Sequence, residues 1–143
     1  MKSLENYMNV TSQIPLGASA SKSVVVTHDL TVAHYHPDMP EVYGTPFMIY
    51  LMEVAAADAI EPFLPNGWVS VGASINVRHL AATPTGFTVT AFAKVIAIEE
   101  RLITFHISAH DGIETIGQGE HVRTAIELRR FENKVQEKAA IER

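Results

Sequence analysis

Hydrophobic and polar residues alternate in short runs over most of the chain, which is typical of β-strands that have one buried face. The β-branched run "SVVVTHDLTV", residues 23–32, predicts a first strand. Later alternating runs predict four more strands, and the Asp-Gly pair in "HDGIE" predicts a hairpin turn before the last of them. These four strands are expected at residues 69–80, 87–98, 102–110 and 115–128.

One segment, Thr45 to Ile60, lacks this alternation and predicts a helix. Thr45 is a suitable N-cap and Pro46 suits the first helical position. The segment "FMIYLMEVAAADAI" follows without a helix breaker, and Pro62 stops it soon afterwards. Because the helix is apolar on nearly every side, it cannot lie on a surface and has to be wrapped by other parts of the structure.

The order strand, helix, then four strands predicts an α+β protein with a hot-dog fold, in which an antiparallel sheet wraps round one long central helix. Such a sheet has an open edge, and the helix needs cover on its far side, so we expect a homodimer. Residues 1–22 show no clear period and include Pro15 and Gly17, which predicts a loosely ordered arm. A single domain is expected over residues 23–143.

Composition and charge narrow the possible functions. The chain has 143 residues, 47% of them hydrophobic and 19% charged, which is typical of a globular domain. A net charge of -5 argues against nucleic acid or an acidic membrane surface as the main partner. The chain contains no cysteine, which excludes disulfides, thiolate zinc sites and a cysteine nucleophile. We find no signal peptide or membrane span, so a cytoplasmic protein is expected.

Two residues on otherwise apolar surfaces stand out. His79 should face the helix, because it shares its parity in the predicted strand with five apolar residues: Val69, Val71, Ala73, Ile75 and Val77. Glu53 is the only acid in the helix before Asp58, and acids are rarely buried without a partner. The two residues either form a structural ion pair or provide a carboxylate and a histidine for acid/base or nucleophilic chemistry.

Thr45 is the third candidate. A capping role explains it fully, but the first turn of a buried helix also offers backbone amides, such as those of Phe47 and Met48, that could hold an oxyanion. Thr45 and Glu53 are eight residues apart, which corresponds to about 12 Å along the helix axis. Joint action on one small group therefore requires an extended substrate or helices from two subunits.

Other polar groups give weaker signals. His34 and His36 form an H-x-H pair that lacks a third ligand at a fixed spacing, so no metal site is predicted. Four cations are either phosphate contacts or ordinary surface charges: Arg78, Lys94, Arg101 and Arg123. The common phosphate-binding and serine-hydrolase motifs are missing.

Three blocks closely resemble the hot-dog thioesterases related to fluoroacetyl-CoA thioesterase: "MPEVYGTPFMIYLMEVAAADAIEPFL", "VGASINVRHLAATPTG" and "ISAHDGIETIGQGEHVR". The resemblance covers roughly residues 24 to 135. It implies a catalytic triad of Thr45, Glu53 and His79, and it matches the glycine of the acyl pocket to Gly72. Where the fluoroacetyl-specific enzyme has phenylalanines that close over the acyl group, this chain has "YHPDMPEVYG" with Met39, so fluoroacetyl selectivity does not follow.

The predicted function is hydrolysis of a small acyl-CoA thioester without a metal, with coenzyme A entering as part of the substrate. Glu53 acts as nucleophile or general base and His79 orients it or moves a proton. Substrate contacts are expected from Met39, Pro46, Phe47, Gly72 and Arg123. Two alternatives stay open at this point: a hot-dog hydratase acting on acyl thioesters, and a non-catalytic acyl-CoA binding module.

Overall fold

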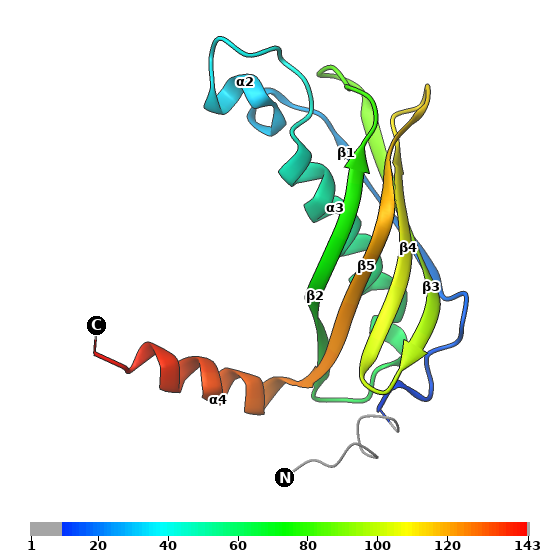
Figure 1. Ribbon diagram of the computed structural model, residues 1–143, viewed down its shortest axis with the longest axis vertical. Coiled ribbons are helices and arrows are strands. Elements are labelled where there is room, and N and C mark those ends of the chain that lie inside the picture. The colour runs from blue at the N-terminus through cyan, green and yellow to red at the C-terminus, as the bar shows by residue number, and fades with distance from the viewer. Residues whose placement is uncertain (1–9, 143) are drawn as a thin grey trace.

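The fold consists of one antiparallel sheet and one long helix, followed by a C-terminal helix (Figure 1). A computed structural model describes residues 10–142. In chain order the elements are β1 Ser19–Val25, η1 His28–Leu30, α2 Val32–Tyr35, α3 Thr45–Ile60, η2 Glu61–Phe63, β2 Trp68–His79, β3 Thr88–Glu99, β4 Leu102–His110, β5 Thr115–Glu127 and α4 Leu128–Ala139.

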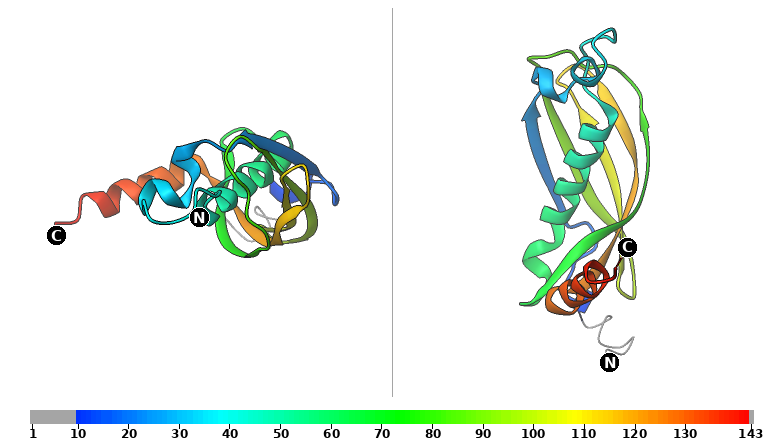
Figure 2. Two further views of the ribbon diagram at one scale, coloured as in Figure 1. Left: turned by 90° about the horizontal axis from the view of Figure 1, so that it is seen from above. Right: turned by 90° about the vertical axis from the view of Figure 1, so that its left-hand side faces the viewer.

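The five strands are ordered β1-β3-β4-β5-β2, and every neighbouring pair is antiparallel. The sheet curls round α3, which lies in its concave side (Figure 2). The predicted hot-dog architecture is therefore confirmed. Within residues 10–142, β1 and β2 form the two edges of the sheet.

The core lies between α3 and the concave face of the sheet. Helix side chains such as Met48, Met52 and Ala56 are fully buried against strand residues such as Phe105 and Ile107. The cover is incomplete, however. Pro46 and Tyr50 are exposed and Glu53 and Ala57 are half-buried, and these four positions lie on one face of α3. A single chain thus leaves one face of its central helix open, and this is the far side for which the sequence predicts cover by a second copy.

The N-terminal part differs from the prediction. The first strand covers Ser19–Val25, not 23–32, and the chain then forms the short helices η1 and α2. Two residues of the predicted arm, Val10 and Ile14, are buried in the core, while residues 1–9 lie outside the described part of the chain. Strand β1 is largely exposed; only Ala20 and Val24 pack against the core, and the strand pairs with β3 over its whole length.

A β-bulge in β2 changes which side chains face the helix. The pairing with β5 shifts between Gly72 and Ser74, so Ala73 has no partner. Ile75, Val77 and His79 face α3 as predicted, but before the bulge the inward positions are Ser70 and Gly72. The prediction that Val69, Val71 and Ala73 share the face of His79 is wrong, because the extra residue reverses the alternation.

The two ends of the molecule each carry an element that protrudes from the body. Helix α2 lies at one end and α4 at the other, and both project toward the side on which α3 and the β2 edge are open (Figures 1 and 2). No helix within residues 10–142 is long and apolar enough to cross a membrane.

Candidate active site

Thr45 and His79 form one half of the candidate site. Thr45 is the first residue of α3 and His79 the last of β2, and the Thr45 hydroxyl lies 2.8 Å from Nδ1 of His79. The N-cap of α3 is Gly44, and no side chain caps it. The capping role predicted for Thr45 is therefore wrong, and its hydroxyl engages the histidine instead.

The environment of His79 keeps its ring neutral. Burial lowers the pKa of His79 below its ordinary value of 6.5, because a charged ring loses solvation there. The second ring nitrogen, Nε2, is buried and has no hydrogen-bond partner among residues 10–142. Buried polar atoms are rarely left without a partner, so this nitrogen marks a place where another polar group is needed.

Glu53 forms the other half of the site, two turns further along α3. Its Oε2 atom lies 3.6 Å from Nη1 of Arg123. It also lies against the backbone of Gly72: a Cβ atom added at that glycine would be 2.7 Å from Oε2. The resemblance pointed to Gly72, and its lack of a side chain is what makes room for the carboxylate.

Arg123 is held in one position by three further contacts. Its Nε donates to the Ser70 hydroxyl at 2.8 Å, Nη2 donates to the Ser70 carbonyl at 2.9 Å, and Nη1 lies 3.2 Å from Nε2 of His121. Only 8% of the Arg123 side chain is exposed, so the interpretation as a surface cation is wrong for this residue. The guanidinium is a fixed positive charge beside Glu53.

His121 supports this arrangement and was missed in the sequence. The ring is buried, with Nδ1 2.7 Å from the Ser74 carbonyl. Burial lowers the pKa of His121, and the neighbouring Arg123 adds to this effect. A neutral ring that donates from Nδ1 to Ser74 accepts from Arg123 at Nε2, which satisfies both nitrogens. His121 and Arg123 are two positions apart on β5 and therefore face the same side of the sheet. This shared parity is the feature of the sequence that could have identified His121.

The two halves of the site do not meet within one chain. Among residues 10–142, Glu53 and His79 are neither hydrogen-bonded nor ion-paired, so the structural ion pair considered from the sequence is not formed. Glu53 lies beside Gly72 of β2, and His79 is seven positions further along the same strand. Each half has the groups expected of a catalytic centre but lacks the groups of the other.

The first turn of α3 offers fewer free amides than expected. The N–H groups of Phe47 and Met48 both donate to the Gly44 carbonyl, at 3.1 and 3.2 Å. The prediction that these amides are available to an oxyanion is therefore wrong for this structure. Pro46 and Phe47 instead line an apolar cavity of about 380 Å³ beside the helix N-terminus, whose other walls are Thr31, Val32, Tyr35, His36 and Gly44.

The loop that contains Met39 lies further out. Met39 is exposed and lines a shallow cavity of about 510 Å³ together with His36, Pro37 and Asp38. It does not line the cavity beside Phe47. Tyr35, stacked on Phe47 with ring centres 6.0 Å apart, borders that cavity together with Phe47.

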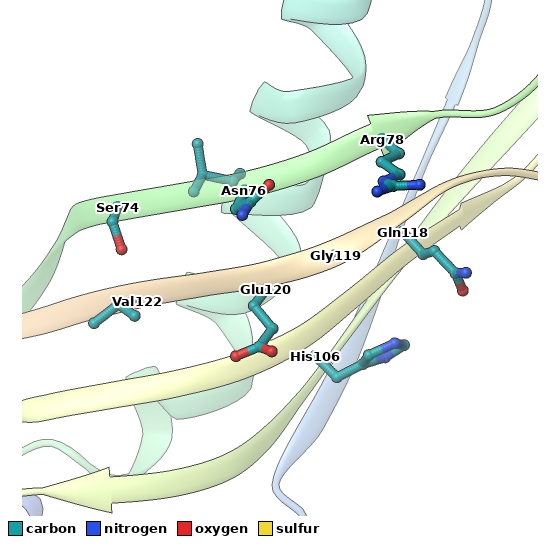
Figure 3. Close-up of a pocket in the computed structure, with 9 residues that line it drawn as sticks. Ser74, Asn76, Arg78, His106, Gln118, Gly119, Glu120 and Val122 are labelled. Atoms are coloured by element: carbon teal, nitrogen blue, oxygen red, sulfur yellow. The ribbon is translucent and has the colours of Figure 1, made fainter.

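A separate hollow of about 710 Å³ lies on the outer face of the sheet. Figure 3 shows its side chains on strands β2, β4 and β5, with Arg78, His106 and Glu120 pointing away from α3. It contains none of Thr45, Glu53 and His79, so it is not part of the candidate site. Within the described residues no three His, Asp or Glu side chains gather as metal ligands would, and this applies to His34 and His36 as well.

The comparisons with known proteins agree on one family. The profile of the fluoroacetyl-CoA-specific thioesterases matches residues 26–129. The curated fluoroacetyl-CoA thioesterase of Streptantibioticus cattleyicolor is 41% identical over 129 residues, covering 86% of this chain and 93% of the relative. Both matches include Thr45, Glu53 and His79.

Solved structures extend the similarity to three dimensions. A variant of the fluoroacetyl-CoA-specific thioesterase in complex with fluoroacetate and CoA is 41% identical, with a TM-score of 0.75, covering 82% of this chain and 98% of the other. A hot-dog-like protein from Thermanaerovibrio acidaminovorans has a TM-score of 0.84 at 24% identity, covering 94% of this chain and 100% of the other. The second likeness concerns the fold alone.

Proposed function

The chain belongs to the fluoroacetyl-CoA-specific thioesterase family and is an acyl-CoA thioester hydrolase, and we propose that Thr45, Glu53 and His79 carry out the hydrolysis in a site shared by two copies of the chain. The observation that carries this proposal is the separation of the groups along one edge strand: Glu53 lies beside Gly72, and the Thr45–His79 pair lies at the end of β2.

The edge strand β2 offers a way to bring the two halves together. If β2 pairs with β2 of a second copy about a two-fold axis, the two strands run antiparallel. A register that places Gly72 opposite His79 of the partner, with the bulged Ala73 left unpaired, centres the axis on Asn76. Because Glu53 lies against Gly72 and Thr45 against His79, this register brings Glu53 of each copy to the Thr45–His79 pair of the other.

The open face of α3 supports the same homodimer. Tyr50 is 69% exposed on the face that also carries Pro46, Glu53 and Ala57. Large apolar groups exposed together are typical of interfaces. Continuing the sheet across β2 would place the two α3 helices side by side, so that each open face is covered by the other.

The mechanism then assigns each group a task. The Thr45 hydroxyl, held by His79, lies at the position where it can orient the thioester carbonyl. Glu53 removes a proton from water, whose oxygen attacks the carbonyl carbon, and the C–S bond breaks. His79 takes this proton from Glu53 and passes it to the coenzyme A thiolate, which leaves the free acid and free coenzyme A and restores the Glu53 carboxylate. The same placement also permits Glu53 to attack directly, with water then cleaving the anhydride.

The substrate contacts follow from the positions of the other residues. We assign the acyl group to the apolar cavity bordered by Pro46 and Phe47, next to Thr45. Arg123 holds the Glu53 carboxylate in position, and Gly72 leaves room for it. Met39 contacts the substrate only if its loop moves inward, because it is exposed here. Coenzyme A is part of the substrate, in line with the CoA complex of the related enzyme.

The test is thiol release from a panel of short, branched, aromatic and halogenated acyl-CoAs. Glu53→Gln should lower kcat by about 10²–10⁴-fold, the usual contribution of a general base, while KM changes little. Asp58→Asn is the matched control, because Asp58 is the other acid of α3 and is exposed. If Glu53→Gln turns over as fast as Asp58→Asn, the assignment of Glu53 is wrong. Binding without turnover by the parent protein would contradict hydrolysis.

A further inference from the structure

The C-terminal helix α4 carries an apolar stripe that nothing covers within the described residues. Leu128, Phe131 and Val135 follow the spacing i, i+3, i+7 on one side of the helix, and Val135 is 52% exposed. The opposite side is polar, with Arg129, Asn133 and Glu137. The helix continues directly from β5 and extends away from the body (Figure 1), so its own chain does not bury the stripe.

The other end of the molecule shows a matching surface. Helix α2 exposes 61% of Tyr35, which borders the apolar cavity beside Phe47. This cavity is open in the single chain at the end that carries Thr45. The segment from η1 to the start of α3 also carries three acids, Asp29, Asp38 and Glu41, whereas α4 has four basic and two acidic side chains. Both surfaces thus carry exposed apolar groups, and the charges on the α2 end are opposite in sign to the net charge of α4.

We propose that α4 of one copy docks on the α2 end of a second copy and closes its acyl cavity. The inference rests on the two-fold arrangement of the proposed function. A two-fold axis across the middle of β2 exchanges the two ends of the molecule. Since α2 and α4 project to the same side at opposite ends, the axis brings α4 of each copy to the α2 end of the other (Figure 2).

This docking gives the apolar stripe a function. Phe131 and Val135 would lie over Tyr35 and Val32 of the second copy and exclude water from the cavity in which the acyl group sits. A drier cavity strengthens the electrostatic contacts made by Thr45 and Glu53 to the reacting thioester. The second copy thereby contributes Glu53 to each site from its helix α3 and the cover of each acyl cavity from its helix α4.

Cross-linking tests the contact directly, because the chain has no cysteine of its own. Two variants would be prepared: Val135→Cys combined with Tyr35→Cys, and Asn133→Cys combined with Tyr35→Cys as the matched control on the opposite side of α4. Mild oxidation should yield a covalent dimer from the first and much less from the second, since a disulfide requires Cα atoms about 4.4–6.8 Å apart. Single-cysteine Val135→Cys should remain monomeric on a denaturing gel.

Equal cross-linking of the two pairs, or none in a protein that sediments as a dimer, overturns the docking. A disulfide of single Val135→Cys with itself also overturns it, because α4 would then contact another α4. A monomer in solution contradicts the docking and the shared site together. Since none of these results depends on turnover, loss of the docking is distinguishable from loss of the hydrolase mechanism.

The functional effect has its own readout. Val135→Asp should raise KM for the best acyl-CoA by about tenfold, in the range seen when a central apolar contact is lost. Asn133→Asp, which adds the same charge on the opposite side of α4, should leave KM unchanged. Equal KM values for the two variants would show that the stripe does not cover the cavity.

Discussion

The chemistry of the site depends on a neutral histidine whose two nitrogens have different roles. Nδ1 of His79 is engaged by the Thr45 hydroxyl, and Nε2 is the nitrogen left for proton transfer. Burial is the cause of the lowered pKa of His79, and a neutral ring can accept the proton that Glu53 takes from water and pass it to the thiolate. Arg123 positions Glu53, since it is a fixed cation 3.6 Å from the Glu53 Oε2 atom.

The lowered pKa of His79 predicts a particular pH profile. A protonated ring lacks the lone pair that proton transfer requires, so kcat/KM should fall as the pH decreases through the pKa of His79. Burial lowers this pKa in the single chain, whereas a Glu53 carboxylate from a second copy beside the ring favours its charged form and raises the pKa. The midpoint of the acid limb should therefore lie at lower pH for the residual activity of Glu53→Gln than for the parent. Thiol release across pH 4.5–8 measures both midpoints, with sedimentation at each pH as a control for dissociation. Equal midpoints would contradict a contact between His79 and Glu53 of a second copy.

Single residues could be predicted when they break a clear pattern. Glu53 and His79 stand among apolar neighbours and could be selected from the sequence, although Glu53 lies on the open face of α3. The inward position of Arg123 could not be predicted, because the inward positions of β5 include Gly117, Gly119 and His121, and these do not form an apolar pattern that would mark the face. The Thr45 hydroxyl was also misjudged, since the sequence does not show that His79 ends its strand beside the first turn of α3.

At the scale of elements, the bulge in β2 decides how the site is built. Without the extra residue, Gly72 would lie on the outer face, and Glu53 would meet a different backbone position. A bulge depends on how two strands pair, so one strand's alternation does not reveal it. For the same reason the predicted β1 was displaced: residues 19–25 are mainly polar, and it is their pairing with β3 that makes them a strand. The helix and the later strands had strong patterns and were predicted well.

Gly72→Ala tests this role of the bulge. The new Cβ would be 2.7 Å from Oε2 of Glu53, so the carboxylate has to move away, which a flexible side chain can do at little cost. The free energy of unfolding should change by less than about 1 kcal/mol, while kcat/KM should fall by about tenfold because the carboxylate is displaced from its working position. Steady-state kinetics and thermal unfolding measure the two effects.

Ala73→Ser is the matched control, because Ala73 is exposed at the neighbouring position and has no cross-strand partner. It should change neither quantity. Full activity of Gly72→Ala at unchanged stability would show that the contact between Gly72 and Glu53 has no catalytic role.

At the scale of the whole molecule, the proposed arrangement makes one chain half of an active unit. The chain has an edge strand β2, an open face on α3 and a C-terminal helix that extends away from its own body. The proposed two-fold arrangement would complete each of these features. The sequence predicted a second copy from the apolar helix and the open edge, but the proposal of which residue each copy supplies needs the positions of Glu53 beside Gly72 and of His79 at the end of β2.

The most direct measurement uses purified heterodimers made from two differently tagged copies. In the first, one copy carries Glu53→Gln and the other His79→Ala; in the second, one copy carries both substitutions and the other none. A shared site predicts that the first heterodimer keeps one intact site and about half of the parental activity, and that the second is inactive. The opposite result, an inactive first heterodimer and a half-active second one, would show that each chain contains a complete site and would contradict the account.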